Sequence, residues 1–392
     1  MLRRIVTSTS FAPVLFWAIS LSVFLIQGWD IIAAGAHLPW DASWYGRIVL
    51  EGYRFDGDYS VQQTVAFFPL HPGVVWVVHR LLGVSVGVAE LVACATMTLA
   101  ACLIFHRTLK HLLGEPVATM TVGLWVANPF AIYLFNGYSE AALVLCLAIF
   151  FWFLLVRPRM HWVVLAVIAA SLARPYGIFL SLVFFLYALH AWWRSGWDHT
   201  WRTVLLVHVP LTFTGYLGWA LYCQLRFGDP LATLHATQAW TGAGMPLTVS
   251  NYLTLQAPLE SVRGLFTGDT VLDPVAMGTI LFFGGLLLFL AFARRFPPVL
   301  VLFGLLMPLL VLPVVGQRGG VMNAGRYELP YIVHFAALAM LLVGFDRRVV
   351  RAEPSGDDSN PSIPLAFYPV YLLFLAAFAR YAGYNFNGIW VS

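Results

Sequence analysis

Charged residues are scarce in this chain. Only 10% of its 392 residues are Asp, Glu, Lys or Arg, whereas a soluble domain carries about 25%. Hydrophobic residues make up 60% of the sequence, and its mean hydropathy is +0.80. A soluble fold could not bury this much apolar surface. The composition therefore excludes a soluble protein and predicts an all-α polytopic integral membrane protein.

Lysine is almost absent, and the basic residues are scattered. Lys110 is the one lysine, and the arginines stand in short clusters between apolar runs. This distribution is typical of a membrane protein with positively charged cytoplasmic loops, so no nucleic-acid partner is expected. The four cysteines lie in apolar segments without metal-ligand spacing, and we expect them to be small core residues of helices.

Sequence motifs that bind nucleotides or metal ions are missing as well. The sequence has no Walker loop, no His/Cys cluster with metal-ligand spacing and no glycine fingerprint for a nucleotide. A cytoplasmic nucleotide-sugar donor is therefore not expected. No cofactor is required by the pattern, and metal dependence is left open.

Apolar segments divide the chain into expected membrane spans. Arg3 and Arg4 place the start of the first span in the cytoplasm, and we expect this span to be retained rather than cleaved as a signal peptide. The long run at 162–193 is divided at Arg174-Pro175, because otherwise the paired arginines that follow would lie outside. The eleven expected spans are 14–32, 86–105, 117–135, 141–156, two within 162–193, 203–223, 275–293, 299–315, 327–345 and 365–381.

We expect residues 1–392 to form one transmembrane domain, without the internal repeats typical of transporters. The first outer loop, 33–85, contains an apolar segment at 67–82 that is broken by Pro69 and Pro72. These prolines favour an interfacial or re-entrant helix over a span. The other long connections are an outer loop at 224–274 and a polar cytoplasmic linker at 346–364.

Ionisable and aromatic side chains converge on the outer face of this topology. An ionisable residue at the membrane is costly and indicates function by default, whereas aromatic residues are common at both membrane interfaces. The polar residues placed there are Asp41, His71, Glu140, Arg174, Asp229, Gln238 and Arg326, and the aromatic ones are Trp40, Trp44, Tyr45, Tyr138, Trp240 and Tyr327.

Asp41 has two interpretations. It follows the first span, so its carboxylate could act near the lipid surface as a general base on an acceptor hydroxyl. Alternatively, an aspartate before Ala-Ser-Trp-Tyr could cap the N-terminus of a helix. Asp30, at the end of the first span, is a competing carboxylate.

Arg174 and Arg326 also have two interpretations. A guanidinium matches a phosphate group bidentately, so either residue could hold a lipid phosphate. Alternatively, each could form a structural pair with Glu140 or Glu328. Glu140 could orient a sugar hydroxyl or an arginine, or could only begin a helix, and His71 could contact phosphate or be structural.

A transporter or lipid flippase is the alternative from another class. It would carry inverted repeats and charged residues at mid-membrane depth. The ionisable residues of this chain lie at the outer ends of the spans instead, which favours an enzyme. Glu90, inside the second expected span, is the exception.

Five motifs follow one another along most of the chain: Trp40-Asp41-Ala42 with Ala66-Phe67-Phe68-Pro69-Leu70-His71-Pro72, Asn128-Pro129 with Gly137-Tyr138-Ser139-Glu140, Leu172-Ala173-Arg174-Pro175-Tyr176-Gly177, Phe227-Gly228-Asp229-Pro230-Leu231 with Gln238-Ala239-Trp240, and Gly325-Arg326-Tyr327. Each motif alone is weak, but five in the same order are specific. Together they resemble the GPI mannosyltransferase 2 family (class V phosphatidylinositol-glycan proteins). His71 and Pro175-Tyr176 depart from that family's usual residues.

This resemblance implies a GT-C superfold with about eleven transmembrane helices and an active site at the outer membrane surface. It implies an inverting transfer of mannose from a polyprenyl-phosphate donor, with Asp41 as the base and Arg174 or Arg326 stabilising the leaving phosphate. The residues that it implies for substrate binding are Trp40, Tyr45, His71, Tyr138, Glu140, Arg174, Gln238, Trp240 and Arg326.

The acceptor and the membrane are less closely defined. The short outer loops offer no large domain for choosing a protein, so we expect a lipid-linked or glycolipid acceptor, although a protein acceptor or another polyprenyl-phosphate sugar is an alternative. The Arg-rich, Lys-poor composition favours a prokaryotic homologue. The protein is expected in the plasma membrane of a prokaryote, or in the endoplasmic reticulum of a eukaryote, with its active site on the outer or lumenal side.

Overall fold

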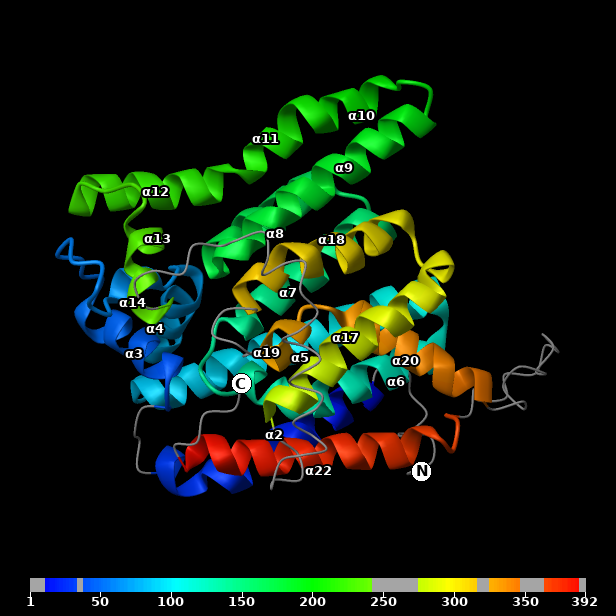
Figure 1. Ribbon diagram of the computed structural model, residues 1–392, viewed down its shortest axis with the longest axis horizontal. Helices are drawn as coiled ribbons and strands as arrows, with labels where there is room; N and C mark the ends of the chain where they lie inside the picture. Colours follow the sequence, from blue (N-terminus) through cyan, green and yellow to red (C-terminus); the bar gives the residue numbers. More distant parts are fainter. Residues whose placement is uncertain (1–10, 34–37, 242–273, 316–323, 346–362, 388–392) are drawn as a thin grey trace.

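Helices make up the regular structure of the described part of the chain. The computed structural model describes residues 11–33, 38–241, 274–315, 324–345 and 363–387, and these ranges contain no strand. Figure 1 shows a bundle whose long helices run roughly side by side, with successive helices in opposite directions. The all-helical prediction is confirmed for these residues.

Within these described ranges, three helical stretches are long and apolar enough to cross a membrane, namely Phe11–Ala33, Val86–Leu113 and His199–Phe227. The protein is therefore a membrane protein. Shorter apolar helices overlap the other expected spans, and the total of eleven spans stays a prediction. The long helices are α2 (Phe11–Ala33), α5 (Val86–Leu113), α6 (Glu115–Ala127), α7 (Glu140–Phe151), α8 (Met160–Ala173), α9 (Phe179–Arg194), α12 (Thr214–Phe227), α17 (Pro274–Phe292), α18 (Pro298–Val315), α20 (Ile332–Phe345) and α22 (Phe367–Phe386).

The division at Arg174-Pro175 is present in the structure. Helix α8 ends at Ala173, a 3-10 turn spans Pro175–Ile178, and α9 begins at Phe179. The proline explains the break, because a residue before proline is driven out of the helical region. Arg174 is extended, with φ −153° and ψ 150°. Its side chain therefore starts from a break between two helices.

Two expected spans are interrupted near the same end of the bundle. The segment 117–135 is not one helix, because α6 ends at Ala127 and a 3-10 helix, η2 (Pro129–Leu134), follows. The Asn128 side chain accepts a 2.8 Å hydrogen bond from the Phe130 amide and so caps this helix. The segment 327–345 is likewise divided between α19 (Ala324–Glu328) and α20, around Pro330.

Short helices gather at one end of the bundle, on the left in Figure 1. They belong to two outer loops of the expected topology, the first at 33–85 and the long one at 224–274. Helix α4 covers most of the expected interfacial segment, and its interfacial placement stays a prediction. Parts of the expected outer loop at 224–274 and of the linker at 346–364 lie outside the described residues. These elements are α3 (Asp41–Glu51), η1 (Thr64–Ala66), α4 (Leu70–Leu82), α13 (Ala232–Ala236) and α14 (Gln238–Thr241).

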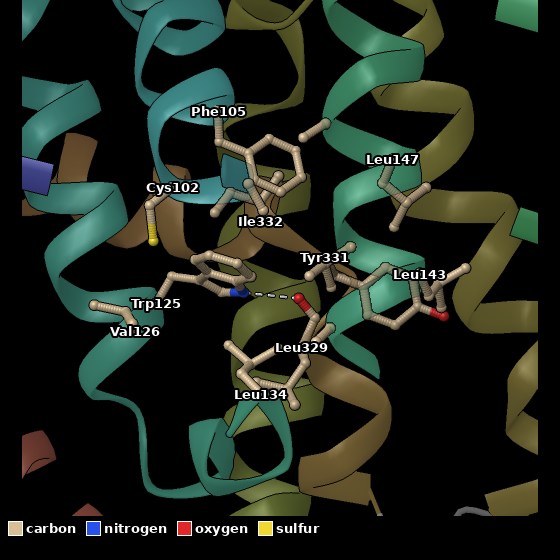
Figure 2. Packing of buried hydrophobic residues seen from close by; sticks show 14 of the residues in the cluster. Cys102, Phe105, Trp125, Val126, Leu134, Leu143, Leu147, Leu329, Tyr331 and Ile332 are labelled. Atoms are coloured by element: carbon tan, nitrogen blue, oxygen red, sulfur yellow. Dashed lines mark hydrogen bonds between the residues drawn. The ribbon is translucent and has the colours of Figure 1, made fainter. Parts of the chain in front are cut away.

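The main core joins α5, α6 and α7 to the segment between α19 and α20. Figure 2 shows the Trp125 indole donating a 2.8 Å hydrogen bond to the Leu329 carbonyl, with Phe105 packed against the indole and Leu143 beside Tyr331. A buried indole that finds a partner contributes both apolar area and a fixed orientation. This packing holds Leu329 in place, three residues after Arg326. All four cysteines are buried and unpaired, as expected for core residues.

A smaller core connects the two outer loops, and we call it the loop core. The Trp219 indole donates a 2.8 Å hydrogen bond to the Thr233 hydroxyl, which donates in turn to the Val65 carbonyl at 2.9 Å. These bonds tie α12, α13 and η1 together. The buried members of the loop core are Val65, Phe68, Trp219, Cys223, Ala232 and Ala236.

Candidate functional site

Asp41 is the first residue of α3, and its carboxylate contacts an arginine 285 positions away. Oδ2 of Asp41 accepts a 2.8 Å hydrogen bond from Nη1 of Arg326. The cap position belongs to Trp40, which has φ 63° and makes no side-chain capping bond. The side chain of Asp41 is 19% exposed. Its carboxylate is thus paired but reachable, and it does not serve as the cap.

Two arginines share Glu140, at the N-terminus of α7. Nε of Arg326 and Nη1 of Arg174 both donate to Oε1 of Glu140, which is completely buried. The two guanidiniums and the two carboxylates of Asp41 and Glu140 balance in formal charge. We call these four residues the charge network. Of the alternatives left open by the sequence, the structure shows both arginines paired with Glu140, and their binding of phosphate stays a prediction.

Arg326 has a strongly stabilised positive charge. Burial alone lowers the pKa of this guanidinium, but the nearby carboxylates of Glu140 and Asp41 outweigh burial and raise its pKa well above the usual value. The group also lies over two tyrosine rings, 4.6 Å from the centroid of Tyr138 and 5.3 Å from that of Tyr133. Cation–π contacts of this kind add attraction when they are desolvated.

Tyr133 was not among the residues expected from the sequence. It lies in η2, inside a segment that was expected to be a continuous span, where an aromatic residue carries no special signal. Tyr138 was expected, and its hydroxyl accepts a 3.3 Å hydrogen bond from the Asp41 amide. The two rings therefore position both the arginine and the start of α3.

A tight turn at 136–139 brings Tyr138 and Glu140 to Asp41. Gly137 has φ +73°, where a side chain is strained, and a Cβ there would lie 2.9 Å from the Cβ of Ala42. Its carbonyl accepts a 2.8 Å hydrogen bond from Nε2 of His71. Two residues later in the turn, Ser139 Oγ accepts a 2.8 Å hydrogen bond from the Tyr45 hydroxyl. Side chains from α3 and α4 thus clamp this turn.

The protonation states fit these roles. Burial lowers the pKa of His71 to about 4, so its ring is neutral at pH 7. Since Nε2 must donate to the Gly137 carbonyl, the proton of the neutral ring lies on Nε2. Burial also raises the pKa values of Tyr45 and Tyr138. Both phenols therefore keep their protons at neutral pH.

Glu90 lies beside this turn. It is fully buried in α5, and neither of its carboxyl oxygens has a hydrogen-bond partner in the described part of the chain. A Cβ on Gly137 would lie 3.2 Å from Oε2 of Glu90. The buried carboxyl of Glu90 therefore lies next to the turn at Gly137, which belongs to the candidate site.

The remaining candidates lie on the surrounding elements. Trp40 is 37% exposed at the start of α3. Gln238 and Trp240 lie on α14, which follows the helix tied into the loop core. Their roles in substrate binding stay predictions. Among the other residues singled out above, Trp44 stacks on Phe67 and has Arg47 over its ring. Asp229 pairs with His235 at 2.7 Å, and Glu328 pairs with His334. Tyr327 follows Arg326 on α19, and Asp30 is exposed near the end of α2.

No cluster suited to a metal ion was found in the described ranges, by the criterion of three or more His, Cys, Asp or Glu side chains together. The charge network instead places two cations beside a reachable carboxylate. Such a site can offer guanidinium N–H donors to an anionic group and bring a base close to it.

Comparison with solved structures identifies the fold of this chain. No family model and no curated protein matches the sequence. Among solved structures, the oligosaccharyltransferase of Archaeoglobus fulgidus in complex with Zn and sulfate matches with a TM-score of 0.58 and 17% identity, over 94% of this chain and 53% of that one. ArnT from Cupriavidus metallidurans bound to undecaprenyl phosphate matches with a TM-score of 0.54 and 18% identity, over 95% of this chain and 75% of that one.

Both are membrane glycosyltransferases of the GT-C class. The chain has a GT-C fold. A further structure of the Archaeoglobus fulgidus protein AglB, with an inhibitory peptide and a dolichol-phosphate, matches with a TM-score of 0.54 and 12% identity, over 97% of this chain and 55% of that one. This chain thus spans about half the length of the oligosaccharyltransferase. The expected GT-C superfold is confirmed, whereas the resemblance to the GPI mannosyltransferase 2 family is not confirmed by any comparison.

Proposed function

We propose that this protein is an inverting glycosyltransferase that moves mannose from a polyprenyl-phosphate donor to a lipid-linked or glycolipid acceptor on the outer membrane face. The observation that carries the proposal is the charge network. Asp41, a reachable carboxylate, contacts Arg326, and Arg326 is linked through buried Glu140 to Arg174. A candidate base and two candidate phosphate-binding guanidiniums thus belong to one hydrogen-bonded group, which supports the proposal.

The reaction follows from these positions. Asp41 would take the proton of the acceptor hydroxyl while that oxygen attacks the anomeric carbon. The bond from the anomeric carbon to the phosphate oxygen would break in the same step, inverting the configuration. The leaving phosphate is already anionic and needs no general acid, and Arg326 or Arg174 would stabilise the charge that grows on it.

The fold neighbours support the donor class. One is a structure of ArnT bound to undecaprenyl phosphate, and another is AglB in complex with a dolichol-phosphate. A chain with the same fold and with arginines beside a carboxylate is well suited to a polyprenyl-phosphate sugar. Mannose itself rests on the motifs that resemble GPI mannosyltransferase 2.

The decisive experiment compares the wild type with Asp41→Asn. Each purified protein is incubated in nanodiscs with polyprenyl-phosphate [14C]mannose and a membrane lipid extract, with and without divalent cations and a chelator. Labelled lipid is then separated by thin-layer chromatography. We expect transfer by the wild type and a loss of roughly a hundredfold or more in Asp41→Asn, because asparagine keeps the size of the side chain but cannot accept the proton.

Asp30→Asn is the matched control, since Asp30 is the competing carboxylate near the end of the first helix and is exposed. It should transfer label as the wild type does. Equal transfer by wild type and Asp41→Asn would remove Asp41 from the chemistry. A wild type that transfers no sugar from any polyprenyl phosphate would contradict the proposed activity.

A transporter or flippase is the second candidate, and buried, unpartnered Glu90 is the observation that favours it. An intramembrane carboxyl of this kind often marks an ion path. Under this alternative, Glu90→Gln would abolish movement of a fluorescent polyprenyl phosphate across proteoliposomes, and Asp41→Asn would not.

A further inference from the structure

Helix α19, which carries Arg326, packs between η2 and α17. Arg326 faces the charge network, where it contacts Asp41 and Glu140. Glu328, two residues later on the same short helix, contacts α20 and lies against α17 instead. Successive residues of an α-helix are rotated by about 100°, so side chains two positions apart point to nearly opposite sides. The contacts of Glu328 therefore influence how α19 is turned, and with it the direction of Arg326.

The partner of Glu328 is His334, the third residue of α20. Nδ1 of His334 lies 2.9 Å from Oε1 and 3.2 Å from Oε2 of Glu328, and both side chains are almost completely buried. The pair spans the break at Pro330 between α19 and α20. A buried polar pair is costly to separate, because each partner loses its hydrogen bonds and meets no water in exchange. This pair therefore favours one angle between the two helices.

The backbone between α19 and α20 is held at the same place. The Tyr331 amide donates a 2.9 Å hydrogen bond to the Glu328 carbonyl, and the Tyr331 ring stacks on that of His334 with the centroids 5.2 Å apart. The Trp125 indole holds the Leu329 carbonyl (Figure 2). The side-chain pair thus belongs to a connection that is fixed along its length.

Gly285 allows α17 to approach the pair closely. A Cβ on Gly285 would lie 2.8 Å from Oε1 of Glu328 and 3.1 Å from Nδ1 of His334. A Cβ on Gly284, the preceding residue, would have no heavy atom within 4 Å. One added methyl group therefore displaces the pair at position 285 and meets open space at position 284.

We propose that Glu328 and His334 are positioning residues for the transfer reaction, which turn α19 so that Arg326 faces Asp41 and the leaving phosphate. Neither residue contacts a reacting group, and both act through Arg326. The proposal rests on the function proposed above, because that function gives Arg326 its role. The alternative is a pair that only stabilises the fold, and that would change the amount of folded protein but not the action of Arg326.

The first comparison is Gly285→Ala with Gly284→Ala as its matched control. Both full-length proteins are assayed in nanodiscs, and kcat and the KM for polyprenyl-phosphate mannose are measured separately. We expect Gly285→Ala to lower kcat by roughly tenfold, less than the loss of a whole charge-stabilising donor costs. KM should change much less, because a displaced Arg326 chiefly loses its contact with the charge that develops during the reaction. Gly284→Ala should behave as the wild type does.

The second measurement asks whether the effect passes through Arg326. Arg326→Lys keeps the positive charge but lacks the planar fork of the guanidinium. In this background we expect Gly285→Ala to cause little further loss of kcat, because the group that it displaces is already gone. A general structural defect would lower kcat by the same factor in both backgrounds.

A third readout needs no turnover. Asparagine in His334→Asn places an amide nitrogen near the position of Nδ1 and can still donate to Glu328, whereas leucine in His334→Leu cannot. We expect amide hydrogen exchange in residues 324–331 to accelerate in His334→Leu and to be restored in His334→Asn, while α5 stays protected. Should His334→Leu fail to fold, Gly285→Ala against Gly284→Ala supplies the same comparison.

Three results would overturn the proposal. These are an equal kcat in Gly285→Ala and Gly284→Ala, an equal factor of loss with and without Arg326→Lys, and exchange in residues 324–331 that neither Gly285→Ala nor His334→Leu accelerates. A wild type that transfers no sugar from any polyprenyl phosphate would contradict the proposed function instead. The exchange comparison would then still decide whether the pair of Glu328 and His334 holds α19.

Discussion

At the scale of single residues, Arg326 pairs with Asp41 at the edge of a buried charge network. A buried ion pair is costly to form, and removing one partner typically costs about 3–5 kcal/mol because the other charge is left unpaired. Here Arg326 has a second carboxylate, Glu140. Under the proposed function, a donor phosphate that drew the guanidinium away from Asp41 would leave Arg326 paired with Glu140. The network would thus free Asp41 without leaving Arg326 unpaired.

His71 gives a prediction about pH. Burial lowers its pKa from the ordinary 6.5 to about 4, while Tyr45, Glu140 and Arg174 are the other titratable or charged groups near its ring. Between these two pH values the unfolded chain binds more protons than the folded one. Its contribution to stability is therefore complete above about pH 6.5 and declines as the pH falls, by at most about 3 kcal/mol.

The measurement is the midpoint of thermal unfolding in detergent between pH 7.5 and pH 4, compared in wild type and His71→Gln. Glutamine can still donate to the Gly137 carbonyl but does not titrate. We expect the variant to lose less stability than the wild type on acidification. Parallel curves for the two proteins would show that His71 is not neutral and buried as described.

At the scale of elements, the sequence located the helices better than their ends. The break at Arg174-Pro175 was predictable, because proline and the distribution of paired arginines point to the same position. The 3-10 helix after Ala127 was missed, although Asn128-Pro129 marks a helix boundary, because the apolar run continues to Leu134 and no charged residue points to a break there. That helix carries Tyr133, which is why the sequence missed one of the two rings under Arg326.

The candidate site shows the same limit. Asp41, Glu140, Arg174 and Arg326 were all singled out, because charged residues stand out in a hydrophobic chain. What the sequence left open was which carboxylate each arginine contacts, since Arg326 could have paired with Glu328 instead. In the structure Glu328 pairs with His334, six residues further along the chain. Contacts between residues 186 and 285 positions apart depend on packing that composition does not encode.

The loop core supports a prediction about one element. The Thr233 hydroxyl both accepts from the Trp219 indole and donates to the Val65 carbonyl. Thr233→Val keeps the shape but leaves two buried polar groups without their partner, each at a cost of about 1–3 kcal/mol. We expect amide hydrogen exchange to accelerate in α13 and η1, while α5 and α7 stay protected.

Thr237→Val is its control, because the Thr237 hydroxyl is exposed and bonds the carbonyl of Leu234 only three residues earlier. Its exchange pattern should match that of the wild type. If Thr233→Val exchanged no faster than Thr237→Val in η1, the two outer loops would not be joined as the structure has them.

At the scale of the whole molecule, the arrangement of the helices divides the protein into two ends. The turn that contains Ser60 belongs to the end where α3, α4 and α13 gather, and Ser195 lies in the turn between α9 and α10 (His199–Thr203) at the opposite end (Figure 1). The predicted topology places the first turn outside the membrane and the second in the cytoplasm, beside Arg194. Both serines are exposed, and all four native cysteines are buried.

Thiol labelling can therefore test the orientation directly. Cells producing Ser60→Cys or Ser195→Cys are treated with a membrane-impermeant maleimide, before and after permeabilisation. We expect Ser60→Cys to react in intact cells, Ser195→Cys to react only after permeabilisation, and the wild type to stay unlabelled because its thiols are buried. The reverse pattern would place the charge network in the cytoplasm, where a donor on the outer leaflet could not reach Asp41. Labelling of both variants in intact cells would show that one of the helices between them does not cross the membrane.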